Sequence, residues 1–305
     1  MNTRRVVLIG HPVAHSLSPA MHNAAFAHDR LAFRYEAWDV PAEDLGVGVG
    51  RIAAEDTAGA NVTVPHKRAV VSYLDWCDET VKLAGAVNTV VNDHGRLLGY
   101  NTDVAGVANV LRAAGFDGQG DVLLLGAGGA ARGAVVALAR LGVARVHVMN
   151  RTRAHAEAMA QDLAGLGMEV MVHDLVAPAA NQPWVRNLRL VLNATSVGLP
   201  GSGPYPFPDL LWVPDRAVVL DLVYHPGGTP LGLMPRPPGV RFVPGEEVLV
   251  AQGAESYRLW TGRPAPVMVM RTVVHDALRR AAAVHGILRG RAAARAGDGA
   301  VHRES

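Results

Sequence analysis

Lys67 is the residue of this chain best suited to exchanging a proton with a bound molecule. Lys67 and Lys82 are the only lysines among the 29 Lys and Arg residues. A lysine ammonium can lose its proton when it is desolvated, whereas an arginine guanidinium effectively cannot. Lys67 ends the segment Asn61-Val-Thr63-Val-Pro-His66-Lys67 and is our candidate general acid or base, whereas Lys82 is expected at the surface.

A glycine-rich segment after an apolar strand pattern indicates a dinucleotide-binding turn. Gly126-Ala-Gly-Gly-Ala-Ala131 follows the apolar run 121–125 and precedes a helical pattern, the context in which GxGxxG/A is informative. The first glycine permits the tight turn, and the second lets backbone N–H groups approach a pyrophosphate. The start of the helix attracts the negative charge of the pyrophosphate. The alternative is a strand–helix turn without a ligand. The expected cofactor-binding residues are Gly126, Ala127, Gly128, Gly129 and Ala130.

The residues after the next strand favour NADP over NAD. An NAD site usually has Asp or Glu here for the ribose 2′-hydroxyl, but this chain has Asn150, Arg151, Thr152 and Arg153. Guanidinium groups bind phosphate oxygens in a bidentate fork and therefore suit a 2′-phosphate. The alternative is a helix start capped by Thr152, with both arginines in solvent.

Strand-like and helix-like stretches alternate along the chain and must position these residues. This pattern predicts an α/β protein with mainly parallel sheets. Strands are expected at 4–10, 32–40, 59–64, 86–92, 96–100, 121–125, 144–150, 168–172, 188–193, 217–221 and 240–243. Helices are expected at 18–29, from His66, at 104–114, after the glycine-rich turn, at 246–261 and at 266–286. The tail 289–305 is small, polar and Arg-rich, and we predict that it is disordered.

Composition excludes several classes of function. Half of the 305 residues are apolar, which is enough for a sizeable core. The net charge is only +2 and arises in the tail 289–305, so a nucleic-acid partner is not expected. Cys77 is the single cysteine, which favours a cytoplasmic, reducing compartment. We expect neither a signal peptide or membrane span nor a metal site, since HExxH and CxxC motifs are absent from the sequence.

Further short segments complete a pattern that local structure does not explain. These are His15-Ser16-Leu-Ser18-Pro19, Gly85-Ala-Val-Asn88-Thr89, Asn101-Thr-Asp103, Asn193-Ala-Thr195-Ser196 and Gln252-Gly-Ala-Glu255. With the segments above, they make the chain resemble the shikimate dehydrogenase family from about residue 6 to about residue 275. The resemblance implies a substrate domain of residues 1–103, completed by the helices of about 246–288, and a Rossmann-like NADP-binding domain of residues 104–245.

The resemblance also implies the activity, a reversible reduction of 3-dehydroshikimate to shikimate by NADPH in aromatic amino-acid biosynthesis. Lys67 would be the acid–base residue and Asp103 its partner, although Asp103 could instead only cap a helix. The residues implied to bind the substrate are Ser16, Ser18, Asn61, Thr63, Asn88, Tyr224 and Gln252. Thr195 and Gly245 would complete the cofactor site. Ser18 could equally be a helix cap, and the polar residues could serve turns.

Two positions depart from the family pattern. His155 stands near the place of a further family arginine, and Glu247 replaces a frequent glycine.

Three other functions remain possible. A paralogue acting on quinate, on both quinate and shikimate, or on an aminoshikimate would need similar lining residues. A non-catalytic NADP-binding sensor would be expected to lack Lys67 or Asp103. A scaffold acting through the basic tail is the third alternative. We expect a small-molecule substrate and a monomer or homodimer.

Overall fold

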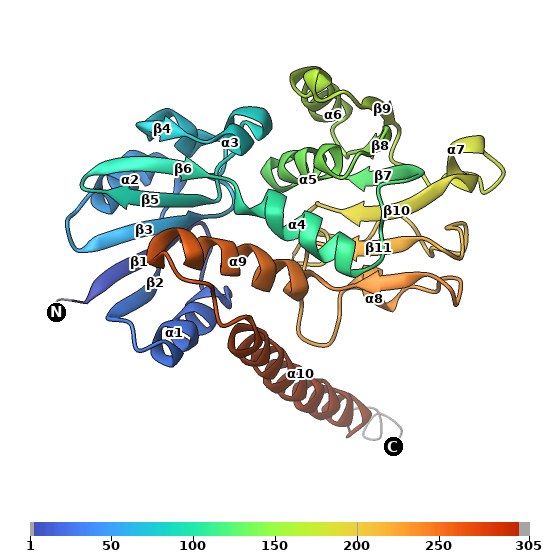
Figure 1. The fold of residues 1–305 in the computed structure, drawn as a ribbon. Helices are drawn as coiled ribbons and strands as arrows, with labels where there is room; N and C mark the ends of the chain where they lie inside the picture. The colour runs from blue at the N-terminus through green and yellow to red at the C-terminus, as the bar shows by residue number, and fades with distance from the viewer. Residues whose placement is uncertain (1–2, 200, 299–305) are drawn as a thin grey trace.

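A computed structural model describes residues 3–199 and 201–298, with the side chains of 285–298 left aside. The described chain forms two six-stranded sheets joined by two long helices (Figure 1). The expected α/β fold with mainly parallel sheets is confirmed. In the part of the chain that is described, no helix has the length and apolar character needed to cross a membrane.

The first sheet has the strand order β2-β1-β3-β5-β6-β4. Strand β1 pairs in parallel with β2 and β3, whereas β5 runs antiparallel to β3 and to β6, with which it forms a hairpin. One face is covered by α1, α9 and α10, and the other by α2 and η2. The elements of this unit are β1 (Arg4–Gly10), α1 (Ser18–His28), β2 (Phe33–Asp39), η1 (Ala42–Asp44), α2 (Leu45–Ile52), β3 (Thr57–Val62), η2 (Ala69–Tyr73), β4 (Trp76–Cys77), α3 (Glu79–Ala84), β5 (Thr89–Asp93) and β6 (Arg96–Tyr100).

The second sheet is parallel throughout and has the order β12-β11-β10-β7-β8-β9. This is the strand order of a dinucleotide-binding Rossmann fold, in which ligands bind where the order reverses, beside the first strand, here β7. Its elements are β7 (Asp121–Leu125), α5 (Gly129–Arg140), β8 (Arg145–Met149), α6 (Arg153–Asp162), η3 (Ala164–Leu166), β9 (Glu169–His173), α7 (Pro183–Arg186), β10 (Leu188–Asn193), β11 (Val218–Asp221), α8 (Pro230–Leu233) and β12 (Arg241–Val243).

Helices α4 (Thr102–Ala113) and α9 (Gly245–Thr261) connect the two sheets and lie side by side between them (Figure 1). They pack so closely that a Cβ atom on Gly106 would lie 2.9 Å from the Cβ atom of Gln252. Apolar residues of both helices belong to the core of the second sheet, and α9 also enters the core of the first. The pair therefore fixes the two sheets relative to each other.

Two expected elements differ from the structure. The helix expected from His66 is a series of turns followed by the short 3-10 helix η2. The reason is that the carbonyl of Lys67 accepts a hydrogen bond from the backbone N–H of Val87 instead of one from the next turn of a helix. Helix α10 (Val267–Asp298) continues past the expected end at 286, so residues 289–298 of the predicted disordered tail are helical. Alanine and arginine, which dominate this stretch, are strong helix formers. Residues 299–305 lie outside the described chain.

The burial of His22 is expected to make the stability of this fold sensitive to acid. Its side chain is fully buried, stacks on Tyr35 at 4.7 Å, and has neither ring nitrogen hydrogen bonded in the described structure. Burial lowers the pKa of His22 from 6.5 to about 3. Between these two values the unfolded chain binds a proton that the folded chain does not. Stability therefore falls as pH falls below 6.5, by about 1.4 kcal/mol per pH unit for this group.

We expect the substitution His22→Phe to flatten the pH dependence of the free energy of unfolding by about one proton. The phenyl ring keeps the stacking and cannot titrate, and no hydrogen bond is lost. Urea unfolding between pH 7 and 5 measures the slope. His94→Asn is the control, because the His94 side chain is 99% exposed. An unchanged slope in His22→Phe would show that His22 does not cause the acid sensitivity.

Candidate functional site

Lys67 and Asp103 meet beside the glycine-rich turn. The Lys67 Nζ donates to Asp103 Oδ2 at 2.5 Å, and the two side chains are 15% and 13% exposed. A Cβ atom on Gly129 would lie 3.1 Å from the Cβ atom of Lys67, and one on Gly133 would lie 3.4 Å from that of Asp103. The ion pair formed by residues 36 positions apart therefore faces the N-terminal turns of α5.

Asp103 is not the N-cap of α4. The cap position is Asn101, whose side chain makes no capping hydrogen bond, and Asp103 lies inside the first turn. Both of its carboxylate oxygens are used elsewhere, because Oδ2 accepts from Lys67 and Oδ1 accepts from Asn88 Nδ2 at 2.8 Å. A carboxylate held by two donors has a defined position, which suits a group that must orient a reacting amine.

Asn88 lies at the centre of the polar network next to this pair. Its Oδ1 accepts from the backbone N–H of Thr102 at 2.7 Å, which determines how the amide is oriented. The Nδ2 then points to Asp103, to Thr102 Oγ1 at 2.9 Å and to Gln252 Oε1 at 3.2 Å. Gln252 donates from its own Nε2 to the carbonyl of Leu249. Helix α9 thus brings Gln252 to the residues that the first sheet supplies.

Asn61 lies behind Asn88 and supports it. It is buried, and both ends of its amide are engaged within the protein. Its Oδ1 accepts from the Tyr35 hydroxyl at 2.8 Å, and its Nδ2 donates to the carbonyl of Asn88 at 3.0 Å. Burial raises the pKa of Tyr35, so this phenol stays protonated and remains a donor. The network places Asn61 one layer further from the Lys67–Asp103 pair than Asn88.

Ser16 and Ser18 lie at the start of α1, and Tyr224 lies next to them. Ser16 Oγ accepts from the backbone N–H of Ser18 at 3.2 Å. Burial raises the pKa of Tyr224, and hydrogen bonds with the Leu17 backbone and the Ser16 side chain oppose that rise. Ser18 is not the cap of α1, since Leu17 occupies that position and no side-chain cap is formed. The Ser18 side chain lowers the pKa of the Tyr35 phenol, against the larger effect of burial, and the Tyr35 hydroxyl donates to Asn61.

Thr63 follows β3 directly and packs its methyl group against Gly10. Its backbone N–H donates to the carbonyl of Ile9, which holds this segment at the end of the first sheet. Within the described chain, the hydroxyl of Thr63 has no hydrogen-bond partner. It therefore remains available to a bound molecule.

The glycine-rich turn has the geometry that a dinucleotide site requires. Gly126 has a φ of 109°, and a Cβ atom there would lie 2.9 Å from the carbonyl oxygen of Ala194. Gly128 has open space around it, and Ala131 is buried against the sheet. Ala127 completes the turn, and Ala130 lies in the first turn of α5, whose first N–H groups have no partners in the helix. These residues fit a pyrophosphate.

Thr195 and Gly245 lie near the same turn. Thr195 Oγ1 donates to Asn193 Oδ1 at 2.7 Å, directly after β10, the strand next to β7. A Cβ atom on Gly245 would lie 2.5 Å from the carbonyl oxygen of Val223, so only glycine fits at the start of α9. Glu247, where relatives often have glycine, pairs with Arg271 at 3.0 Å and with His275 at 3.4 Å and so anchors α10.

The two candidate phosphate-binding arginines differ in their surroundings. Arg151 is exposed and has no hydrogen bond or ion pair to any described residue. Arg153 donates from Nε to Glu157 and from Nη1 to Asp174, each at 2.8 Å. Asn150 Nδ2 donates to the carbonyl of Thr152, which precedes α6 without a side-chain capping bond. Arg151 is therefore the readily available cation of this segment.

Ser256 is a residue of the site that sequence reasoning missed. Its Oγ lies 2.8 Å from Thr89 Oγ1, 3.0 Å from Thr102 Oγ1 and 3.1 Å from Asn61 Nδ2. Ser256 is fully buried and lies one helical turn after Gln252 in α9. That spacing, with a small polar residue on an otherwise apolar face, is the signal that could have found it.

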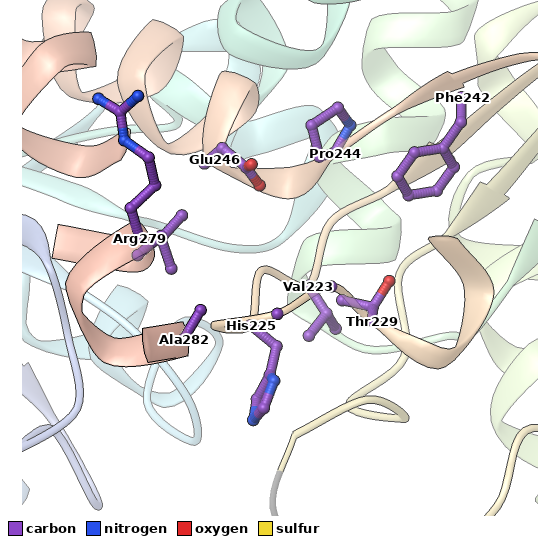
Figure 2. Close-up of a pocket in the computed structure, with 11 residues that line it drawn as sticks. Val223, His225, Thr229, Phe242, Pro244, Glu246, Arg279 and Ala282 are labelled. Carbon is purple, nitrogen blue, oxygen red and sulfur yellow. The ribbon is translucent and has the colours of Figure 1, made fainter. Parts of the chain in front are cut away.

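A cavity of about 290 Å³ is lined by residues of the loop after β11, of the start of α9 and of α10, but by neither Lys67 nor Asp103 (Figure 2). Glu246, at the start of α9, lines this cavity together with His225 and with the α10 residues Arg279 and Ala282. Burial raises the pKa of Glu246. Among the described residues, no group of three or more His, Cys, Asp or Glu side chains is arranged to hold a metal ion.

Comparisons with known proteins match nearly the whole chain. Residues 8–90 match a family model described as the shikimate dehydrogenase substrate binding domain. Residues 113–182 match the shikimate/quinate 5-dehydrogenase model, and residues 245–275 match the shikimate 5′-dehydrogenase C-terminal domain. The shikimate dehydrogenase (NADP⁺) of Moorella thermoacetica is 44% identical over 279 residues, which are 91% of this chain and 94% of that protein.

Solved structures agree with this similarity. The shikimate 5-dehydrogenase of Thermus thermophilus in complex with NADP(H) and shikimate has a TM-score of 0.75 and 37% identity, covering 90% of this chain and 99% of that one. The quinate dehydrogenase of Corynebacterium glutamicum in complex with NAD has a TM-score of 0.80 and 28% identity, covering 90% of this chain and all of the other.

Proposed function

The chain belongs to the shikimate dehydrogenase family, and from this premise we propose that Lys67 and Asp103 are the acid–base pair of its reaction. It is an NADP-dependent shikimate dehydrogenase that reversibly reduces 3-dehydroshikimate to shikimate in aromatic amino-acid biosynthesis. The observation that carries the assignment of the pair is its 2.5 Å contact beside the glycine-rich turn. That contact brings an exchangeable proton next to the expected nicotinamide.

The proton transfer follows from the arrangement of this pair. Bound NADP(H) supplies the hydride donor and acceptor of the reaction. During oxidation the neutral amine of Lys67 takes the proton of the reacting hydroxyl and becomes an ammonium, and during reduction the ammonium returns that proton. Asp103 holds Lys67 Nζ at one oxygen, and Asn88 holds the other oxygen of Asp103. The amine therefore keeps one position while its proton moves.

The substrate side of the proposal rests on short donors and acceptors around the pair. We assign the substrate carboxylate to Ser16, Ser18 and Tyr224, and the ring hydroxyls to Thr63, Asn88 and Gln252. Such neutral groups suit a polyhydroxylated ring because each can pair with one hydroxyl. Asn61 is assigned an indirect role, since its amide is already engaged by Tyr35 and Asn88.

We assign cofactor binding to the turn residues 126–130, to residues 150–153, and to Thr195 and Gly245. The corresponding division of the chain is a substrate domain of residues 1–103 with 246–288 and an NADP domain of residues 104–245. Cys77, the single cysteine, is a free thiol, which supports a cytoplasmic location. A monomer or homodimer is proposed, and sedimentation would measure it.

One assay tests the function. NADPH formation is followed by absorbance with shikimate and NADP⁺, and in parallel with quinate and with NAD⁺. We expect the highest kcat/KM with shikimate and NADP⁺. A higher kcat/KM with quinate would assign the chain to a quinate-oxidising paralogue, and cofactor binding without turnover on either alcohol would indicate a sensor.

Gly128→Ala tests the cofactor turn. The site is open in this structure and its backbone conformation suits alanine, so we expect unchanged urea unfolding. The added methyl group would lie where backbone N–H groups approach the pyrophosphate, and the KM for NADP⁺ should rise about tenfold, equivalent to about 1.4 kcal/mol. Steady-state kinetics with both substrates measures this. A normal KM for NADP⁺ would contradict the placement of the pyrophosphate at Gly128.

A further inference from the structure

We propose that Asp174 weakens binding of the cofactor's 2′-phosphate and so narrows the enzyme's preference for NADP over NAD. The proposal rests on the cofactor site proposed above and concerns a carboxylate just outside its sequence motif. It makes Asp174 a specificity-determining residue, and the first argument for it is the register of two neighbouring strands.

Asp174 reaches the cofactor edge of the sheet from a neighbouring strand. Strands β8 and β9 are parallel, and Met149 pairs with His173. Asp174 therefore follows β9 at the level where Asn150 follows β8. In NAD sites a carboxylate at the end of the second strand binds the ribose hydroxyls. In this chain the second strand lacks that carboxylate, and the third strand brings one to the same edge.

Asp174 also takes part in a clamp around Arg153. Asp174 Oδ1 and Glu157 Oε1 each accept from this one guanidinium at 2.8 Å. These hydrogen bonds, that of Glu157 first, raise the pKa of Arg153. Two carboxylates around one guanidinium leave a net charge of −1, and two of the donor positions of Arg153 are already occupied. Arg153 is therefore a weaker partner for a phosphate than its sequence position suggests.

The other charged groups near this edge also favour repulsion of a 2′-phosphate. Arg151 is exposed and unpaired within the described chain, so we assign the 2′-phosphate to Arg151. His173 precedes Asp174, and burial lowers its pKa, so at neutral pH this ring adds no positive charge. Arg151 is two residues before Arg153, so a phosphate bound to Arg151 would lie near the net negative charge of this clamp, and like charges repel. NAD, which lacks the 2′-phosphate, avoids this repulsion.

The test is direct binding of NADP⁺ and NAD⁺ to Asp174→Asn and Asp174→Ala by isothermal titration calorimetry. In both variants we expect the Kd for NADP⁺ to fall about three- to tenfold at about 50 mM salt, because a nearby like charge is removed. The gain should shrink at about 0.5 M salt, where exposed charges are screened. The Kd for NAD⁺ should not fall.

Asp276→Asn is the matched control. Asp276 is a partly exposed aspartate that also pairs with an arginine, Arg279, but it lies on α10, far from β9 (Figure 1). Its loss changes the net charge equally, and the Kd for NADP⁺ should stay at the wild-type value. Weaker or unchanged NADP⁺ binding in the Asp174 variants would overturn the proposal, and weaker binding would mean that Asp174 orients Arg153 toward the phosphate. This experiment measures cofactor binding and does not depend on turnover. A protein that fails to turn over shikimate would therefore contradict the proposed function without contradicting this proposal.

Discussion

Replacing Lys67 with arginine is expected to reduce kcat by about 10²- to 10⁴-fold while the KM for NADPH stays near normal. Arginine keeps the positive charge and can still pair with Asp103, so the site should keep its electrostatic balance. The guanidinium cannot release its proton, however, and the reacting hydroxyl loses its base. Steady-state kinetics in both directions measures kcat and the KM of each substrate separately.

Lys82→Arg is the matched control for this substitution. Lys82 is the other lysine of the chain, it is exposed on α3, and it lies outside the polar network around Asp103. The same change of side chain there should leave kcat at the wild-type value. If Lys67→Arg also retained wild-type turnover, Lys67 would not be the acid–base residue, because a side chain that cannot release its proton would then serve equally well.

The second large effect is expected for Asp103→Asn, with kcat reduced about 10²-fold. Asp103 accepts hydrogen bonds from Lys67 Nζ and from Asn88 Nδ2 on its two oxygens. An asparagine offers one acceptor oxygen, and its amino group would face the second donor. Either Lys67 or Asn88 then loses its anchor, so the KM for shikimate should rise as well.

Calorimetric binding of NADP⁺ separates this effect from general damage. The Kd for NADP⁺ should stay near that of the wild-type enzyme, because the Asp103 carboxylate bonds to Lys67 and Asn88 and not to the glycine-rich turn. Urea unfolding should remain a single transition. A variant with normal kcat and normal KM for shikimate would show that Asp103 is dispensable, and the pair would then be structural.

Local sequence was enough to predict most elements and the glycine-rich turn. The apolar strand 121–125, the glycines and the following helical pattern lie within about twenty residues, and short-range sterics determine their conformation. The positive φ of Gly126 is such a local requirement. The expected helix from His66 failed because a distant residue, Val87, binds the carbonyl of Lys67 and holds the segment in turns.

Helix capping illustrates the limit of local reasoning at the site. Ser18 and Asp103 both have residue types that commonly cap helices, yet neither does so here. The side chain of Asp103 is engaged instead by Lys67 and Asn88, both from other elements. Ser256 escaped prediction for the same reason, since its partners come from β3, β5 and α4.

The sequence by itself determined the α/β fold class, the glycine-rich turn and the residue types needed for proton and phosphate chemistry. Only the tertiary structure decided which of these side chains meet: that Lys67 reaches Asp103, that Asn61 lies behind Asn88, and that Asp174 occupies Arg153. The physical reason is range. Backbone sterics and hydrophobic periodicity act between near neighbours, whereas hydrogen-bond partners are chosen by the packing of α4 and α9 between two sheets.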